Sequence, residues 1–173
     1  MTFGPDNEAS WEFMRFVQKV TKVAGFNVEF YESAEDQLTK GEGPSGLEVK
    51  FDRKSRETHR YYIEFAQCSR SLGWRWVPSG LFKEEPTWLW AVGTQELFYV
   101  IHRATLSELY FEGVYDIRKC EKDNDTHTRG YCLPMRDMDR KAGWRFVNGK
   151  CEYTRRQTAA YKAGYTAIGR FEW

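Results

Sequence analysis

Residues 45–67 constrain the fold of this chain more than any other stretch does. Their sequence is SGLEVKFDRKSRETHRYYIEFAQ, in which apolar and charged residues alternate over LEVKFD and polar and apolar residues alternate again over YYIEF. A period of two is typical of a β-strand, whose successive side chains point to opposite faces. The basic, polar segment between the two halves predicts a turn. We therefore expect a β-hairpin that carries charged residues along one face.

Two acids of this predicted hairpin suggest a metal site. Asp52 closes the first strand and Glu64 lies within the second, so pairing of the strands would bring both carboxylates to one end of the sheet. Neighbouring carboxylates repel each other unless a cation lies between them. Mg²⁺ takes one or two protein carboxylates and leaves positions for water and phosphate oxygens. This chemistry points to phosphodiester hydrolysis, and the alternative is an ordinary solvated strand face.

The same block of sequence has a family resemblance. The segment LEVKFDRKSRETHRYYIEFAQ, followed by Pro78-Ser79-Gly80-Leu81 and by TWLWAVG, resembles the PD-(D/E)XK, or restriction-endonuclease-like, nuclease superfamily over residues 6–112. The similarity is to its small phage and bacterial members, which carry an E-V-K-x-D strand, an E-T-G-N turn, an I-E strand and a P-S-G-I segment. The resemblance implies an α/β (α+β) fold with a central mixed β-sheet flanked by helices. Residues 113–173 would then be a C-terminal extension of a single domain.

The resemblance also implies an activity and a set of site residues. The expected reaction is endonucleolytic hydrolysis of nucleic acid, with DNA as the expected substrate and Mg²⁺ or Mn²⁺ as the cofactor. Asp52 and Glu64 would bind the metal, with Glu12 or Glu8 of the first helix as a further ligand. The metal would orient and acidify the attacking water.

Two departures from the family pattern leave the site open to a second interpretation. The turn reads Thr58-His59-Arg60 where the family often has Thr-Gly-Asn. Glu64 is followed by Phe65-Ala66 where the family has an acid-x-lysine motif, so Lys50 or Gln67 would have to supply the polar group. Alternatively, Asp36 followed by Glu48-Val49-Lys50 matches the acid, spacer, acid-x-lysine signature literally. We prefer Asp52 with Glu64, because the signature acids of the family lie on the second and third strands of a meander.

Basic residues accompany the predicted metal site. The predicted turn holds four of them, and a fifth lies between two tryptophans further along: Arg53, Lys54, Arg56, Arg60 and Arg75. Guanidinium and ammonium groups bind phosphates, and Trp74 and Trp76 offer flat rings on which bases can stack. The alternatives are a solvated charged face for the basic run and core packing for the tryptophans.

The remaining elements are predicted from periodicity, caps and breakers. We expect a helix from Asp6 or Asn7 to Ala24, a helix capped by Thr105 or Ser107, short helices over 79–85 and 135–142, and a final helix over 154–167. Strands are expected over 26–32, 87–93, 97–102 and 131–134, with a loop over 116–130 and a hairpin over 144–153 around Asn148-Gly149.

The composition limits which partners and which cellular location we expect. The 26 basic and 25 acidic residues nearly balance, so any contact with DNA must be local rather than spread over a basic surface. The sequence has no apolar run long enough to span a bilayer, and we expect a cytoplasmic protein of a bacterial or phage-infected cell without a membrane partner. Pairing of two chains into a homodimer is left open.

Two competing interpretations follow from the same residues. A catalytically inactive module that binds nucleic acid or protein on the same fold would also account for the missing acid-x-lysine motif. A zinc-stabilised domain would use Cys120, His127, Cys132 and Cys151, although their spacing matches no finger or ribbon.

Overall fold

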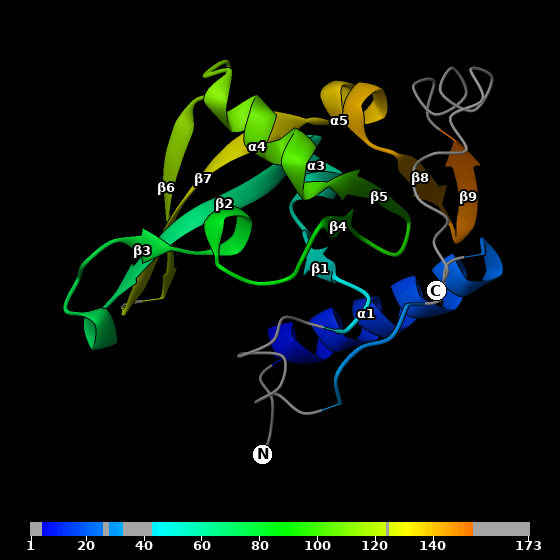
Figure 1. Ribbon diagram of the computed structural model, residues 1–173, viewed down its shortest axis with the longest axis horizontal. Helices are drawn as coiled ribbons and strands as arrows, with labels where there is room; N and C mark the ends of the chain where they lie inside the picture. The colour runs from blue at the N-terminus through cyan, green and yellow to red at the C-terminus, as the bar shows by residue number, and fades with distance from the viewer. Residues whose placement is uncertain (1–4, 26–27, 33–42, 124, 154–173) are drawn as a thin grey trace.

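The chain folds into two β-sheets and associated helices. The computed structural model describes residues 5–25, 28–32, 43–123 and 125–153, and within them four α-helices accompany the two sheets (Figure 1). The α+β class expected from the sequence is confirmed. The expectation of one central sheet is wrong, because the strands divide between two sheets. None of the helices in these described ranges is both long enough and apolar enough to cross a membrane.

The first sheet, sheet A, has five strands. Their spatial order is β1 (Leu47–Phe51), β4 (Leu89–Gly93), β5 (Leu97–His102), β8 (Trp144–Val147) and β9 (Lys150–Tyr153). The pair β1 and β4 is parallel and the other neighbouring pairs are antiparallel, so sheet A is mixed. Helix α1 (Pro5–Val23) covers one face of this sheet with Phe13, Val17 and Val20, which recur at helical spacing.

The second sheet, sheet B, has four antiparallel strands. Their order is β3 (Val77–Pro78), β2 (Arg60–Ser69), β7 (Thr126–Pro134) and β6 (Ile117–Asp123). Residues 117–153, which the sequence analysis assigned to an extension, therefore supply strands to both sheets.

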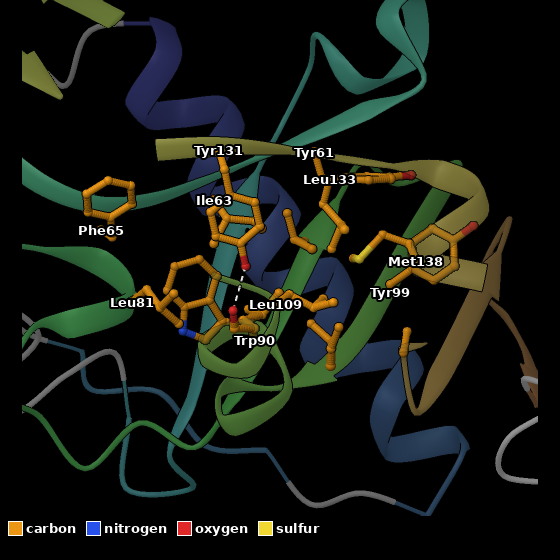
Figure 2. Close-up of a cluster of buried hydrophobic side chains, with 14 residues drawn as sticks. Tyr61, Ile63, Phe65, Leu81, Trp90, Tyr99, Leu109, Tyr131, Leu133 and Met138 are labelled. Carbon is orange, nitrogen blue, oxygen red and sulfur yellow. Dashed lines mark hydrogen bonds between the residues drawn. The ribbon is translucent and has the colours of Figure 1, made fainter. Parts of the chain in front are cut away.

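The main core lies between the two sheets. Figure 2 shows Tyr61, Ile63 and Tyr131 of sheet B pointing toward Trp90 and Tyr99 of sheet A. Side chains from α4 (Arg103–Phe111), α5 (Met135–Lys141) and the 3₁₀ turn η2 (Gly80–Phe82) complete this layer: Leu106, Leu109, Met138 and Leu81. The Tyr131 hydroxyl donates a hydrogen bond to the Leu106 carbonyl at 2.8 Å, so the one polar atom of that ring is satisfied within the core.

The hairpin predicted over residues 45–67 is not formed. Strand β1 lies in sheet A and β2 in sheet B, and the chain between them contains the short helix α3 (Ser55–Thr58), which ends at His59 with a φ of 52°. Strand β1 pairs with β4 and β2 pairs with β7 instead, and the connection between them is longer than the two to five residues usual for a hairpin loop. The alternation that predicted two strands is correct, but each strand buries its apolar side in a different part of the structure.

Asp52 joins the two sheets at the point where the hairpin was expected. Its Oδ1 accepts a hydrogen bond from the Ser55 N–H at 3.1 Å, and its Oδ2 accepts one from the Tyr62 N–H at 3.0 Å. Strand β3 pairs with β2 only at Ala66 and Gln67, so Tyr62 lies on an edge of β2 that β3 does not cover. The carboxylate therefore satisfies a backbone group that strand pairing leaves open.

Local signals predicted several elements well and others poorly. The first helix, the strands β4 and β5, the helix α5 and the hairpin of β8 and β9 are confirmed, the last with positive φ at Asn148 and Gly149. The predicted strand over 26–32 is wrong for residues 28–32, and the loop over 116–130 is wrong because β6 and β7 occupy most of it. The predicted helix over 154–167 and Asp36 lie outside the described residues.

Replacing Asp52 tests its role as a junction. Asp52→Ala leaves the N–H groups of Ser55 and Tyr62 without their acceptor, and we expect the free energy of unfolding to fall by about 2 kcal/mol or more. Urea denaturation followed by circular dichroism measures the change. Glu57→Ala, an exposed substitution on α3, is the matched control and should change stability by less than about 0.5 kcal/mol. Equal stability of Asp52→Ala and the control would contradict the assignment.

Candidate carboxylate site on strand β1

Strand β1 carries a carboxylate and an ammonium on the same face. Glu48 and Lys50 are two residues apart on this strand, and the Lys50 Nζ forms an ion pair with the Glu48 Oε1. Both lie on the side of sheet A that faces sheet B, since Lys50 Nζ is 5.7 Å from the ring centroid of Trp90, a residue of the core between the sheets. Glu48 is only 6% exposed. The site is therefore a buried acid with a lysine at its solvent side.

A second carboxylate meets Glu48 from the loop that precedes β4. The side chain of Glu85 is 4% exposed, and its Oε2 lies 2.8 Å from Lys83 Nζ. The Thr87 hydroxyl donates a hydrogen bond to Glu85 Oε1 at 3.0 Å. Glu48 and Glu85 are within hydrogen-bonding contact of each other, and we call these two residues the carboxylate pair.

Burial disfavours the ionised forms of the carboxylate pair. Burial raises the pKa of Glu48, and this effect exceeds the opposing influence of Lys50. Burial acts on Glu85 in the same direction, but hydrogen bonds from Lys83, Glu48 and Thr87 hold its pKa below the ordinary value. When both groups are ionised, Glu48 Oε2 has no hydrogen-bond partner among the described residues. Burial thus favours the protonated form of Glu48, in which its carboxyl group can donate a hydrogen bond to Glu85.

Arg103 fixes the loop that presents Glu85. Its Nε donates a hydrogen bond to the carbonyl of Leu81 at 2.7 Å, and its Nη1 donates to the carbonyls of Glu85 and Thr87 at 3.1 and 3.0 Å. Its Nη2 donates to the carbonyl of Lys83. One rigid, planar guanidinium thus binds four carbonyls of a single loop, a geometry that lysine cannot reproduce.

The two acids that the sequence analysis paired both lie beside β2, since Asp52 binds the N–H of Tyr62 and Glu64 is two residues further along that strand. Asp52 engages the backbone at Ser55 and Tyr62, and burial raises its pKa although these N–H groups favour the ionised form. Glu64, on β2, accepts a hydrogen bond from the Ser79 hydroxyl at 2.5 Å. Gln67 lies further along β2, opposite Val77 and Thr128. The hydrogen bonds described for Asp52 and Glu64 are thus to different partners.

The other predicted site residues lie at the surface. Glu12 is exposed on α1, which packs on the opposite face of sheet A from Glu48. The four basic residues of the predicted turn surround α3 and are exposed: Arg53, Lys54, Arg56 and Arg60. Arg56 forms an ion pair with Glu96 at 2.7 Å. Arg75 is exposed between η1 (Arg70–Leu72) and β3.

The four residues of the alternative zinc site do not meet. Cys120, His127 and Cys132 lie on β6 and β7 of sheet B, whereas Cys151 lies on β9 of sheet A and packs toward α1. In the part of the chain that is described, no three His, Cys, Asp or Glu residues form a group that could hold a metal ion. The carboxylate pair contains only two acids, so it does not form such a group of three.

Sequence reasoning missed Glu85 and Arg103. Glu85 joins the site because β1 and β4 pair in parallel, a contact between residues about forty positions apart that no local pattern reveals. Arg103 did carry a signal, since it is the first residue of α4, where the helix dipole disfavours a cation. A basic residue at that position indicates an acceptor elsewhere, here the carbonyls of the preceding loop.

Comparison with known proteins yields no match. No family model, no curated protein and no solved structure is significantly similar to the chain.

The buried carboxyl of Glu48 predicts a pH dependence of stability. Because its pKa is raised above the ordinary 4.5, the folded chain binds a proton at a higher pH than the unfolded chain does. This residue therefore destabilises the fold increasingly as the pH rises from about 4.5 through its raised pKa. Glu48→Gln removes the ionisation and keeps a donor toward Glu85. Its stability relative to wild type should improve on raising the pH from acid to neutral, by on the order of 1 kcal/mol.

Urea denaturation of both proteins across this pH range measures the difference. A stability difference that is independent of pH, or one that favours wild type increasingly at higher pH, would show that Glu48 keeps its charge without cost.

Proposed function

We propose that this chain is a metal-dependent endonuclease that hydrolyses phosphodiester bonds of nucleic acid, with DNA as the expected substrate. The observation that carries the proposal is the Glu48-Val49-Lys50 strand, in which a buried carboxylate and a lysine lie side by side next to a second carboxylate. This arrangement supports the literal acid-x-lysine alignment of the restriction-endonuclease-like motif over the alignment on Asp52 and Glu64. In this proposal sheet A with α1 is the nuclease core.

The carboxylate pair fits a divalent cation. Glu48 Oε2 is buried without a partner among the described residues, and it lies against the carboxylate of Glu85. Two carboxylate oxygens in contact are the hard ligands that Mg²⁺ and Mn²⁺ prefer, and both ions accept water and phosphate oxygens at their other positions. Such an ion would neutralise charge on the phosphate and make a bound water more acidic.

The other residues of the site have roles that follow from their placement. Lys50 is partly exposed at the outer side of Glu48, where its ammonium would hold the attacking water or stabilise negative charge on the phosphate. Arg103 acts only as a positioning residue, since it binds the carbonyls of the loop that carries Glu85. The exposed basic residues around α3 would contact the nucleic-acid backbone: Arg53, Lys54, Arg56 and Arg60.

Asp52 and Glu64 have smaller parts in this proposal than in the sequence analysis. Asp52 holds β1, α3 and β2 together through two backbone hydrogen bonds. Glu64 fixes Ser79, whose N–H donates a hydrogen bond to the Phe65 carbonyl at 3.0 Å and which precedes the turn η2. The proposed location in the cytoplasm of a bacterial or phage-infected cell, and the pairing of two chains, stay predictions.

A second candidate function rests on the lysines at the carboxylate pair. Lys50 and Lys83 each contact one of the two acids, so the four side chains are balanced in charge without a metal. That balance favours a catalytically inactive module that binds nucleic acid or protein through its basic surface. Dependence on a divalent metal distinguishes the two functions.

Cleavage assays test the nuclease. We expect the full chain to cleave plasmid or labelled DNA with Mg²⁺ or Mn²⁺ and to leave it intact in EDTA. Glu48→Gln and Lys50→Met should each lower the cleavage rate about 100-fold or more, because each removes a group that would act on the reacting phosphate. Glu84→Gln, a substitution at the exposed neighbour of Glu85, is the matched control and should cleave at the wild-type rate.

Calorimetric titration of the metal-stripped chain with Mn²⁺ separates binding from cleavage. Wild type and Glu84→Gln should bind the ion, and Glu48→Gln should not. Cleavage that persists in Glu48→Gln would refute the site, and a chain that neither binds Mn²⁺ nor cleaves any DNA or RNA substrate would refute the nuclease.

A further inference from the structure

One face of sheet B continues beyond the core into solvent. Along β7, Leu133 and Tyr131 point into the core between the sheets, and Arg129 and His127 follow at alternate positions on the same face. Arg129 is exposed and His127 is partly exposed. In Figure 1, β3 lies at the edge of the molecule, apart from the strands of sheet A. The face therefore changes from a buried to an accessible surface within one strand.

Two tryptophans pack on the accessible part of this face of sheet B. The Trp74 ring lies over His127, with ring centroids 5.3 Å apart and an angle of 30° between the planes. The guanidinium carbon of Arg129 is 4.1 Å from the ring centroid of Trp76. Residues two apart on a strand are about 7 Å from each other, so the two aromatic groups form neighbouring platforms. We call residues 70–76 with His127 and Arg129 the aromatic arm.

The position of Trp74 is unfavourable for stability. Its φ is 60°, a left-handed conformation that bulky residues rarely adopt, and it follows Gly73, whose φ is 61°. The indole remains 45% exposed. Nδ1 of His127 is buried without a hydrogen-bond partner in the described part of the chain. Core packing does not account for a large aromatic side chain held in this way, and such local strain is concentrated at binding and catalytic sites.

The charges of the aromatic arm suit a phosphate backbone. The arm carries three exposed arginines, Arg70, Arg75 and Arg129, and the neighbouring acid Asp125 forms an ion pair with Arg70 at 3.0 Å. The exposed ring of Trp74 and the partly exposed ring of Trp76 can stack on any base, and arginines beside them can contact phosphates. A base can reach these rings only when it is not already stacked inside a duplex.

We propose that the aromatic arm binds single-stranded nucleic acid, with unpaired bases stacked on Trp74 and Trp76 and phosphates held by the arginines. This inference rests on the proposed function, since it assumes that nucleic acid is the ligand. It narrows the substrate to nucleic acids that contain unpaired bases next to the cleaved strand.

Trp74→Gly separates a role of Trp74 in binding nucleic acid from a role in stabilising the fold. Glycine adopts the positive φ without strain, so the variant should melt no lower than wild type does. It should bind a fluorescein-labelled single-stranded oligonucleotide about 5-fold or more weakly, because a stacking platform is lost. Fluorescence anisotropy of the full chain in EDTA and low salt measures binding. Wild type should prefer the single strand to a blunt duplex of the same sequence.

Asn148→Gly is the matched control, because Asn148 also has a positive φ and lies in the turn between β8 and β9. It should leave binding of the single strand unchanged. The inference is overturned if Trp74→Gly binds as wild type does, if its melting temperature falls together with its affinity, or if wild type binds duplex and single strand equally.

Glu48→Gln separates this inference from the proposed function. This variant should bind the single strand as wild type does while it loses cleavage. Metal-dependent cleavage of duplex DNA without binding of single strands would overturn only the aromatic arm. Binding that depends on Trp74 in a chain that cleaves nothing with any divalent metal would support the arm and overturn only the nuclease.

Discussion

The structure depends on which groups form hydrogen bonds with the backbone of β2 where no neighbouring strand pairs with it. Strands β1 and β2 are consecutive in sequence but belong to different sheets, so the edge of β2 nearest β1 needs hydrogen-bond partners from side chains and loops. Asp52 accepts the Tyr62 N–H, and Ser79 binds the Phe65 carbonyl and the Glu64 carboxylate. Asp52 thus links the end of β1 in sheet A to β2 in sheet B, whereas Glu64 fixes the segment that follows β3.

Much of the fold could be predicted because its signals are local. The apolar spacing of α1, the alternation in β1 and β2, and the Asn148-Gly149 turn each depend on residues close in sequence. The division into two sheets could not be predicted in this way. It depends on β1 pairing with β4 and β2 pairing with β7, contacts between distant residues, and a period of two does not indicate which strands are neighbours.

The candidate site was predictable only in part for the same reason. Glu48 and Lys50 lie on one strand, so their spacing alone put them on one face. Glu85 reaches them through the parallel pairing of β1 with β4, and the loop that carries it is held by Arg103 from a later helix. The sequence favours Asp52 and Glu64 through the family's strand order, and it does not show that Asp52 binds backbone N–H groups while Glu48 faces another acid.

The interleaving of the two sheets along the chain has a consequence for synthesis of the protein. Sheet A begins with β1 and is completed by β8 and β9. Strands β6 and β7 of sheet B come from the residues between β5 and β8. A growing chain therefore cannot finish either sheet until most of its residues have left the ribosome, and β1, β4 and β5 emerge with an edge still open. Native pairing of this kind involves long loops and forms slowly. Until residues 117–153 have emerged, these early strands therefore expose backbone groups that are paired in the folded chain.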